Sequence, residues 1–402
     1  MGGHAGLEVS SVSHSIAGPS RVAFLYIAQR HQVLHSLSSA VALARARPDV
    51  AVDVVASSQS VLDYAHTLVR RLGGAPLGWR LLGPAWLRNL PHIDGAPPKA
   101  PLLAAAARDL AGYEVIVAPE RTTALVRRFG VKSRLVYTQH GAGDRAGPFE
   151  PRLAAFDLVF AAGQKQRDRM LIEGLVRPEN CAVVGYAKFE LVDALVSPPP
   201  ELFDRPRPTV FYNPHFSRKL GSWRPWGRAI LDRFAAQDRF NLIFAPHVRL
   251  FGGRPVEALP EFAPFARLPH IHIDLGAGDM AFDMTYANAA DVYLGDVSSQ
   301  AYEFIRKPRP CVFLNPKRVA WRDDESFRHW RLGQVVDDLG ALDAALDAAF
   351  TGAVDFLPAQ REAFQQTFDL EGSPAGRAAD AIARLLPPVQ ALEPERRRAA
   401  TG

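Results

Sequence analysis

A buried strand, a polar turn and the start of a helix follow one another in DVYLGDVSSQAYEF, residues 291–304. The apolar run ends at Gly295, and Asp296, Ser298 and Ser299 come directly after it. These residue types cap helix N-termini, and a turn of this kind also offers hydroxyls and free backbone N–H groups to an anion. The stretch therefore predicts a strand–turn–helix unit, and it leaves open whether the turn only caps the helix or binds a phosphate.

Short apolar runs with room for helices between them recur on both sides of this unit. Unbroken apolar strands that alternate with helices are typical of parallel sheets covered on both faces. A proline-rich segment, SPPPELFDRPRPT at 197–209, separates two such series, and its prolines disfavour helix and central strand. The sequence predicts an α/β protein with two Rossmann-like domains whose parallel sheets face a central cleft.

The boundaries follow from the same pattern. We expect a flexible N-terminal tail (1–19), an N-terminal Rossmann-like domain (20–197), a linker (198–208), a C-terminal Rossmann-like domain (209–384) and a flexible C-terminal tail (385–402). The expected strands are 21–28, 50–57, 113–120, 134–141, 157–163 and 181–186 in the first domain, and 209–215, 240–247, 270–276, 291–296 and 310–316 in the second.

Composition narrows the class of protein. The 402 residues are too many for one compact core, and 48% hydrophobic with 22% charged residues is normal for a soluble globular chain. The two cysteines, Cys181 and Cys311, are far apart in sequence, which favours a reducing compartment. We find no apolar run of about 18 residues and no signal-peptide pattern in residues 1–20, so we expect a cytoplasmic protein.

Mild basicity points to anionic partners without choosing among them. The formal charge is +5, which suits anionic small molecules or a membrane surface as well as it suits nucleic acid. Because this charge is weak evidence for any one partner, we do not expect nucleic acid among the partners. The segment 68–91 is basic and rich in Trp and Leu, a pattern that fits peripheral contact with the inner face of the membrane. Its prolines and glycines fit a packed loop that lines the cleft equally well.

Polar residues gather where the expected strands end, which is where sheets of this type bind ligands. In YTQHGAGD, residues 137–144, His140 ends a buried strand and is followed by Gly141, which lets a backbone approach a ligand closely. Histidine titrates near neutral pH and suits a general base. The alternative is a histidine that merely closes the strand. We place Gly141 and Asp144 among the substrate-binding residues.

Two further strand ends carry a Pro-His pair. They are FYNPHFSRK at 211–219 and IFAPHVR at 243–249. Cationic donors there would stabilise charge on a diphosphate, and ordinary surface-loop polarity is the alternative. The candidate binding residues in these two segments are Asn213, His215, Arg218, His247 and Arg249.

The remaining histidines and the absent motifs narrow the chemistry. His31 and His35 are one helical turn apart after the first strand, and His31 is a candidate on the acceptor side. We assign His270, His272 and His329 to structure. The chain has no Asp-x-Asp pair, no metal-type cluster, no P-loop, no nucleophile elbow and no correctly spaced dinucleotide fingerprint, so we expect neither a metal nor a cofactor.

In order, QHG, NPHF, APH, ADVYLGDVSSQAYEF and PCVFLNP resemble the CDP-glycerol glycerophosphotransferase family of teichoic acid and capsule polymerases. The resemblance covers roughly residues 130–380 and implies the GT-B fold. It implies that His140 is a catalytic base, that His247 acts on the diphosphate, and that Asp296, Ser298, Ser299 and Glu303 bind the nucleotide. Three departures leave the transferred group open: Val297 for tyrosine, His215 for threonine, and Lys188 near the place of an arginine.

The hypothesis is a transferase that moves a glycerol-phosphate or related alditol-phosphate unit from a CDP-activated donor to a glycan or lipid-linked acceptor, releasing CMP. The resemblance places the donor in the C-terminal domain and the acceptor in the N-terminal domain. A GT-B nucleotide-sugar glycosyltransferase or an enzyme similar to UDP-GlcNAc 2-epimerases is the first alternative. A non-catalytic protein that binds nucleotide or glycan is the second.

Overall fold

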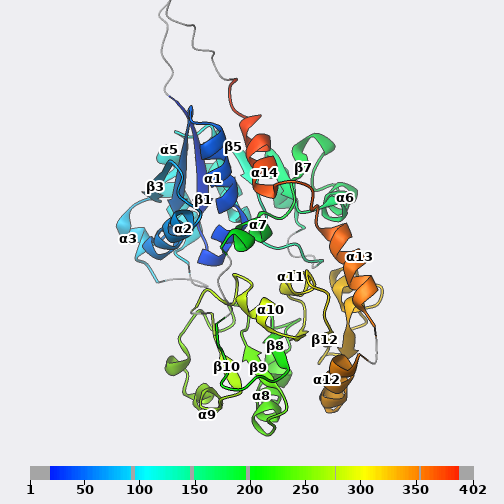
Figure 1. Cartoon of the computed structure of the whole chain (residues 1–402). Helices are drawn as coiled ribbons and strands as arrows, with labels where there is room; N and C mark the ends of the chain where they lie inside the picture. Colours follow the sequence, from blue (N-terminus) through cyan, green and yellow to red (C-terminus); the bar gives the residue numbers. More distant parts are fainter. Residues whose placement is uncertain are drawn as a thin grey trace, which may run out of the picture.

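Two parallel β-sheets form the framework of the chain. The structure is a computed structural model and describes residues 19–91, 96–144, 149–195, 200–276, 278–352 and 355–388. The tails expected at 1–19 and 385–402 lie outside these residues apart from Pro19 and 385–388, as do the first two residues of the expected linker. The two sheets occupy the upper and lower halves of Figure 1.

The first sheet has seven strands in the order β3-β2-β1-β4-β5-β6-β7, and neighbouring strands are parallel. The inner strands β4 and β6 are buried along their whole length, which explains their continuous apolar sequences. The strands are β1 (Ser20–Tyr26), β2 (Val50–Ala56), β3 (Leu77–Leu81), β4 (Val115–Ala118), β5 (Arg134–Tyr137), β6 (Leu158–Ala161) and β7 (Cys181–Val183).

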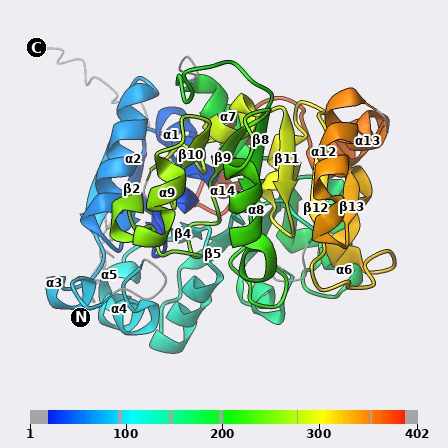
Figure 2. The same ribbon diagram turned by 90° about the horizontal axis from the view of Figure 1, so that it is seen from below.

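The second sheet has six parallel strands in the order β10-β9-β8-β11-β12-β13, which Figure 2 shows side by side. Residues 291–304 form β11 and the short helix α11, the strand–turn–helix unit that their sequence predicts. The strands are β8 (Thr209–Asn213), β9 (Asn241–Phe244), β10 (Ile271–Ile273), β11 (Val292–Gly295), β12 (Cys311–Leu314) and β13 (Gln334–Val336).

Helices connect the strands and cover the sheets. In the first domain they are α1 (Leu37–Ala46), α2 (Gln59–Arg71), α3 (Ala85–Arg88), α4 (Lys99–Ala105), α5 (Ala107–Leu110), α6 (Gln164–Ile172) and α7 (Ala187–Ala194), with the 3-10 segments η1 (Arg30–His35), η2 (Arg121–Phe129), η3 (Pro151–Ala155) and η4 (Pro178–Asn180). After β8 they are α8 (Arg228–Ala235), α9 (Ala263–Ala266), α10 (Thr285–Ala289), α11 (Gln300–Phe304), α12 (Leu342–Thr351), α13 (Leu357–Thr367) and α14 (Pro374–Ala383), with the π turn η5 (Trp223–Gly227) and the 3-10 segments η6 (Val256–Ala258), η7 (Pro260–Phe262), η8 (Glu325–Leu332) and η9 (Leu339–Ala341).

The last two helices return to the first domain. Figure 1 shows α13 passing from the lower to the upper half, and α14 lying beside α1. Glu190 of α7 accepts hydrogen bonds from the Ser373 hydroxyl and from the Ala375 N–H at the start of α14. Residues 374–383 belong by sequence position to our expected C-terminal domain, 209–384, but they pack on the N-terminal one. The boundaries themselves stay a prediction.

Two edge strands, β3 and β13, are absent from our expected strands. β3 lies within 68–91, the segment for which we considered membrane contact or a packed loop, and it pairs with β2. The segment also holds α3, whose Trp86 is 67% exposed. Within the described residues, no helix combines the length and the apolarity needed to cross a membrane.

The strand orders place one site-forming position in each sheet. Each order reverses once, between β1 and β4 in the first sheet and between β8 and β11 in the second. Ligands of open α/β sheets bind beyond the carboxyl ends of the strands at such reversals. A ligand site is therefore expected among the loops that follow these strands.

Candidate functional site

A cavity of about 520 Å³ is lined by loops from the carboxyl ends of both sheets. Every site residue expected from the sequence lines it except Asn213, Arg218 and Asp296. The first domain contributes the segments after β1, β4 and β5, and the second contributes those after β8, β9 and β11. Residues more than 150 positions apart in sequence thus share one hollow.

His140 has one ring nitrogen fixed and one available. Its Nδ1 lies 2.5 Å from the Pro119 carbonyl oxygen, which can only accept a hydrogen bond, so Nδ1 carries the proton. In the neutral ring, Nε2 is then an acceptor. Burial lowers the pKa of His140 below its ordinary value of 6.5, against the opposing effects of Glu120 and the Pro119 carbonyl. His140 is therefore neutral at physiological pH and has the tautomer of a general base.

His215 and His247 have the opposite tautomer. The Ser217 N–H donates to Nδ1 of His215 at 3.0 Å, and the Arg249 N–H donates to Nδ1 of His247 at 3.2 Å. Since Nδ1 accepts in both rings, the proton lies on Nε2, which is a hydrogen-bond donor. The two rings lie 5.2 Å apart, centroid to centroid. Two adjacent N–H donors suit the oxygens of a phosphate.

His31 links the two sets of histidines. Its ring centroid is 6.4 Å from that of His140 and 6.4 Å from that of His247. His35 lies on the same 3-10 segment as His31, and its ring centroid is 6.5 Å from that of His140. The Nδ1 atoms of His31 and His35 are enclosed and have no hydrogen-bond partner among the described residues. Burial, followed by neighbouring positive charge, lowers both pKa values well below 6.5, so both rings are polar and neutral at physiological pH.

The loop after β5 meets the turn after β11 at very short range. A Cβ on Gly141 would lie 3.0 Å from the Ser299 hydroxyl oxygen, and one on Gly143 would lie 3.0 Å from the Ser299 Cβ. Gly141 also has a φ of +135°, which L side chains rarely adopt. Ser299 makes no capping bond to α11, while the Ser298 hydroxyl accepts from the Gln300 N–H at 3.3 Å. Ser299 therefore faces the other domain instead of serving its own helix.

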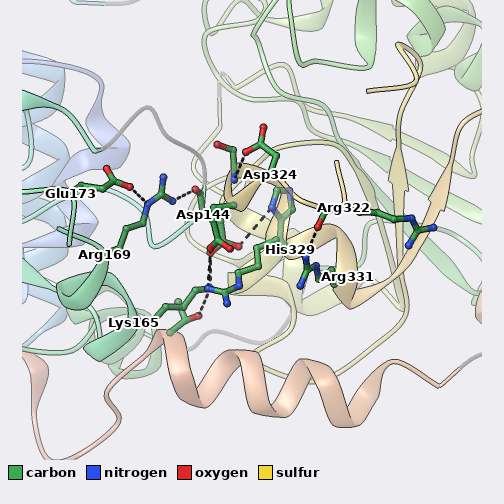
Figure 3. A network of polar contacts seen from close by, with 12 residues as sticks. Asp144, Lys165, Arg169, Glu173, Arg322, Asp324, His329 and Arg331 are labelled. Carbon is green, nitrogen blue, oxygen red and sulfur yellow. Dashed lines mark hydrogen bonds and ion pairs between the residues drawn. The ribbon is translucent and has the colours of Figure 1, made fainter. Parts of the chain in front are cut away.

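Asp144 is the centre of a network that joins the domains (Figure 3). Lys165 of α6 lies 2.6 Å from one of its oxygens, and the Tyr302 hydroxyl of α11 donates to the other. Nδ1 of His329 is 3.9 Å from Asp144, while its Nε2 contacts the Asp296 carbonyl at 3.0 Å. Asp144 thus lines the cavity with its carboxylate already engaged. His329, which we assigned to structure, also lines the cavity.

A buried ion pair forms a second link between the domains. Nζ of Lys188, in α7, lies 2.6 Å from Glu303, in α11, and the Tyr186 hydroxyl donates to the same carboxylate at 2.8 Å. Both charged side chains are at most 7% exposed. They line the cavity, and each satisfies the other's charge without a ligand.

Three expected binding residues lie outside the cavity for identifiable reasons. Asp296 is buried and accepts hydrogen bonds from the backbone of His215, Ser222 and Val297, so it holds the loop after β8 in place. The Asn213 amide donates to the Ala245 carbonyl at 2.7 Å, between strands β8 and β9. Arg218 is exposed. None of the three is carried into the function proposed below.

Sequence reasoning missed Lys99, Glu120 and Arg121 in the first domain's wall. Lys99 lies 2.9 Å from Glu120, which also accepts from the Thr122 N–H and hydroxyl at 3.3 and 3.0 Å. Glu120 is the last residue of the expected strand 113–120, so its position at a strand end was a usable signal. In the described part of the chain, no group of three His, Cys, Asp or Glu side chains is arranged to hold a metal ion.

Acid should destabilise this histidine-rich fold before its carboxylates titrate. His31, His35, His140 and His329 have folded-state pKa values below 6.5, so the unfolded chain binds more protons as pH falls through that value. Each contributes stability that is complete above about pH 7 and is lost at up to about 1.4 kcal/mol per pH unit below 6.5. Urea denaturation at pH 7.5, 6.5 and 5.5 measures this, and equal stability at all three would contradict it. The His31→Gln variant should show a shallower decline.

Comparisons with known proteins establish the fold. No protein-family model matches the chain, and no curated protein matches it. Among solved structures, S. aureus MnaA with UDP is 12% identical and superposes with a TM-score of 0.58 over 90% of this chain and 95% of its own. The Neisseria meningitidis UDP-GlcNAc 2-epimerase bound to UDP-GlcNAc is 10% identical with a TM-score of 0.54, over 91% of this chain and 99% of its own.

The wall teichoic acid polymerase TagF is similar to the same degree. One of its structures is 10% identical with a TM-score of 0.58, over 92% of this chain and 88% of its own. At these identities the likeness shows the fold alone. The chain therefore has the GT-B architecture that the resemblance implied, with two Rossmann-like parallel-sheet domains.

Proposed function

We propose that the protein transfers a glycerol-phosphate or related alditol-phosphate unit from a CDP-activated donor to a hydroxyl of a glycan or lipid-linked acceptor. The arrangement of histidine tautomers across the cavity carries this proposal. His140 presents an unprotonated Nε2 from the first domain, while His215 and His247 present Nε2–H donors from the second. One side is suited to accept a proton and the other to hold a phosphate.

The reaction divides between these two walls. Nε2 of His140 takes the proton of the acceptor hydroxyl as its oxygen attacks the β-phosphorus of the donor. The bond from the β-phosphorus to the bridging oxygen breaks, and CMP leaves with that oxygen. His215 and His247 donate hydrogen bonds to the phosphate oxygens, and Arg249 adds positive charge at the same wall. Positioning and fixed charge supply most of the rate in phosphoryl transfer.

The known structures of this fold support a nucleotide donor. A TagF structure was soaked with CDPG, and the MnaA structure contains UDP. In the chain itself, Ser298, Ser299 and Glu303 remain our candidates for donor contacts because they line the cavity beside the two donor histidines. Peripheral association with the membrane, where a lipid-linked acceptor would lie, is part of the proposal.

Donor choice is tested by thermal stability and product analysis. We expect CDP and CDP-glycerol to raise the melting temperature more than UDP or GDP, and we expect CMP as the nucleotide product once an acceptor is supplied. The Ser298→Ala/Ser299→Ala variant should lose most of the CDP shift, while Ser326→Ala, at the exposed start of η8, should keep it. Release of UDP from a UDP-sugar, with no response to CDP, would overturn the proposal.

A nucleotide-sugar enzyme of the 2-epimerase kind is the second candidate. It is favoured by the 99% coverage of the Neisseria meningitidis UDP-GlcNAc 2-epimerase chain and by the carboxylate of Glu120 in the cavity wall. Conversion of UDP-GlcNAc to its 2-epimer without an acceptor would establish it. Tight CDP binding with no turnover on any acceptor would instead favour a binding protein.

A further inference from the structure

The carboxylate of Glu120 lines the cavity, and the proposed transfer gives it no role. Glu120 follows β4, the strand next to the chain reversal of the first sheet. Its Oε2 contacts Lys99 at 2.9 Å and the Gln32 side-chain amide at 3.3 Å. Its Oε1 accepts from the N–H and hydroxyl of Thr122. Four donors from three segments therefore fix this carboxylate in the wall.

The same backbone that carries Glu120 orients His140. The Pro119 carbonyl, one residue before Glu120, accepts the Nδ1–H of His140 and so sets its tautomer. The bonds that fix Glu120 also fix the position of this carbonyl, since the two residues share a peptide unit. Moving the carboxylate would therefore move the acceptor on which the base depends.

We propose that Glu120 is a positioning residue for His140: it anchors the carbonyl that holds the Nδ1 proton, and its charge stabilises the imidazolium formed when Nε2 takes the acceptor proton. The positive charge of Lys99 destabilises the imidazolium and so limits this stabilisation by Glu120. This inference rests on the proposed function for its catalytic meaning. The logic is that of an orienting carboxylate behind a histidine base, with a backbone carbonyl between them.

The charges around His140 determine the sign of the effect. Glu120 raises its pKa, while Lys99 and Arg121 lower it, and the rings of His31 and His35 pack beside it. Burial raises the pKa of Glu120, but Lys99 and the other donors outweigh this and bring it to about 2. Glu120 is therefore anionic throughout the range in which His140 titrates, and only substitution removes its charge.

Two variants of one ion pair separate this role from a structural one. Glu120→Gln removes the negative charge and should lower the pKa of His140, whereas Lys99→Met removes the positive charge and should raise it. If the pair only supported the fold, breaking it from either side would move the titration in the same direction. The control is Asp343→Asn, which breaks an exposed pair with Arg233 in the second domain and should leave His140 unchanged.

The primary measurement needs no substrate. The full-length protein is labelled with 15N-histidine, the His140 resonances are assigned with the His140→Gln variant, and their titration is followed by NMR. In parallel, the acidic limb of the kcat/KM profile for CDP-glycerol should move to lower pH in Glu120→Gln and to higher pH in Lys99→Met. The plateau in Glu120→Gln should fall about tenfold, less than the roughly 100-fold or more expected when the base itself is removed.

The outcomes distinguish this inference from the proposed function. Opposite shifts of the His140 titration support the inference even if CDP-glycerol is not turned over, a result that would count against the proposed function alone. Shifts in one direction, or none, overturn the inference even where CMP is released normally. If Glu120→Gln does not fold, Lys99→Met decides by itself, because the inference requires it to raise the pKa of His140.

Discussion

Replacement of His140 by alanine is expected to lower kcat/KM by about 10²–10⁴-fold, the usual contribution of a general base. Donor affinity should change little, because in the proposed mechanism the imidazole acts on the acceptor hydroxyl while the opposite wall holds the donor. The measurement is CMP release from CDP-glycerol in the presence of acceptor, together with calorimetric titration of CDP. Because burial keeps the pKa of His140 below 6.5, the proposed activity of the wild-type protein should persist at a pH where an exposed histidine is protonated.

The matched control is His66→Ala. His66 is an exposed histidine of α2 on the surface of the first domain. Its ring centroid lies 4.9 Å from that of Trp79. It should retain wild-type turnover. Full activity in a folded His140→Ala variant would show that another group is the base.

Breaking the buried pair between Lys188 and Glu303 should have the largest effect on stability. Lys188→Met leaves the Glu303 carboxylate enclosed, with the Tyr186 hydroxyl still donating a hydrogen bond but no positive charge beside it. An uncompensated buried charge costs about 3–5 kcal/mol. The double variant Lys188→Met/Glu303→Gln removes both charges and should recover most of that loss. Urea denaturation followed by tryptophan fluorescence measures both.

An ion pair between α7 and the segment just after α11 provides the comparison. Arg306, which follows α11, contacts Asp193 of α7 at 2.6 Å, but these side chains are 31% and 53% exposed. Arg306→Met should therefore cost no more than about 1 kcal/mol. If Lys188→Met were no worse than Arg306→Met, the buried pair would not be what holds α7 and α11 together.

Much of the fold could be predicted because parallel strands that are buried on both faces have continuous apolar sequences. Such sequences predicted inner strands of both sheets, for example β4 and β11. Two of the edge strands, β3 and β13, were not predicted from such sequences. β3 is only partly buried and carries the exposed Arg80, so its pattern resembles a loop. The return of α14 to the first domain was also hidden, because its apolar face does not specify which sheet it covers.

The site could be predicted in part, for a related reason. Strand-end histidines and serines can be found from sequence because strand ends can, and His140, His215, His247, Ser298 and Ser299 all line the cavity. Asp296 could not be told from a ligand contact, since a carboxylate that binds backbone N–H groups and one that binds a substrate have the same sequence pattern. Glu120 was missed because its partner Lys99 is distant in sequence.

What the amino-acid sequence alone determined was the alternation of apolar strands with helices, the division into two domains, and the set of polar groups at the strand ends. Each of these properties depends on residues that are close together in the sequence. Only the tertiary structure decided the tautomer of His140, the pairing of Lys188 with Glu303 and the approach of Gly141 to Ser299. The first depends on a carbonyl 21 residues away in the same domain, and the other two depend on which atoms meet across the domains. The proton on the His140 ring and the charge of the buried Glu303 carboxylate respond to those neighbours.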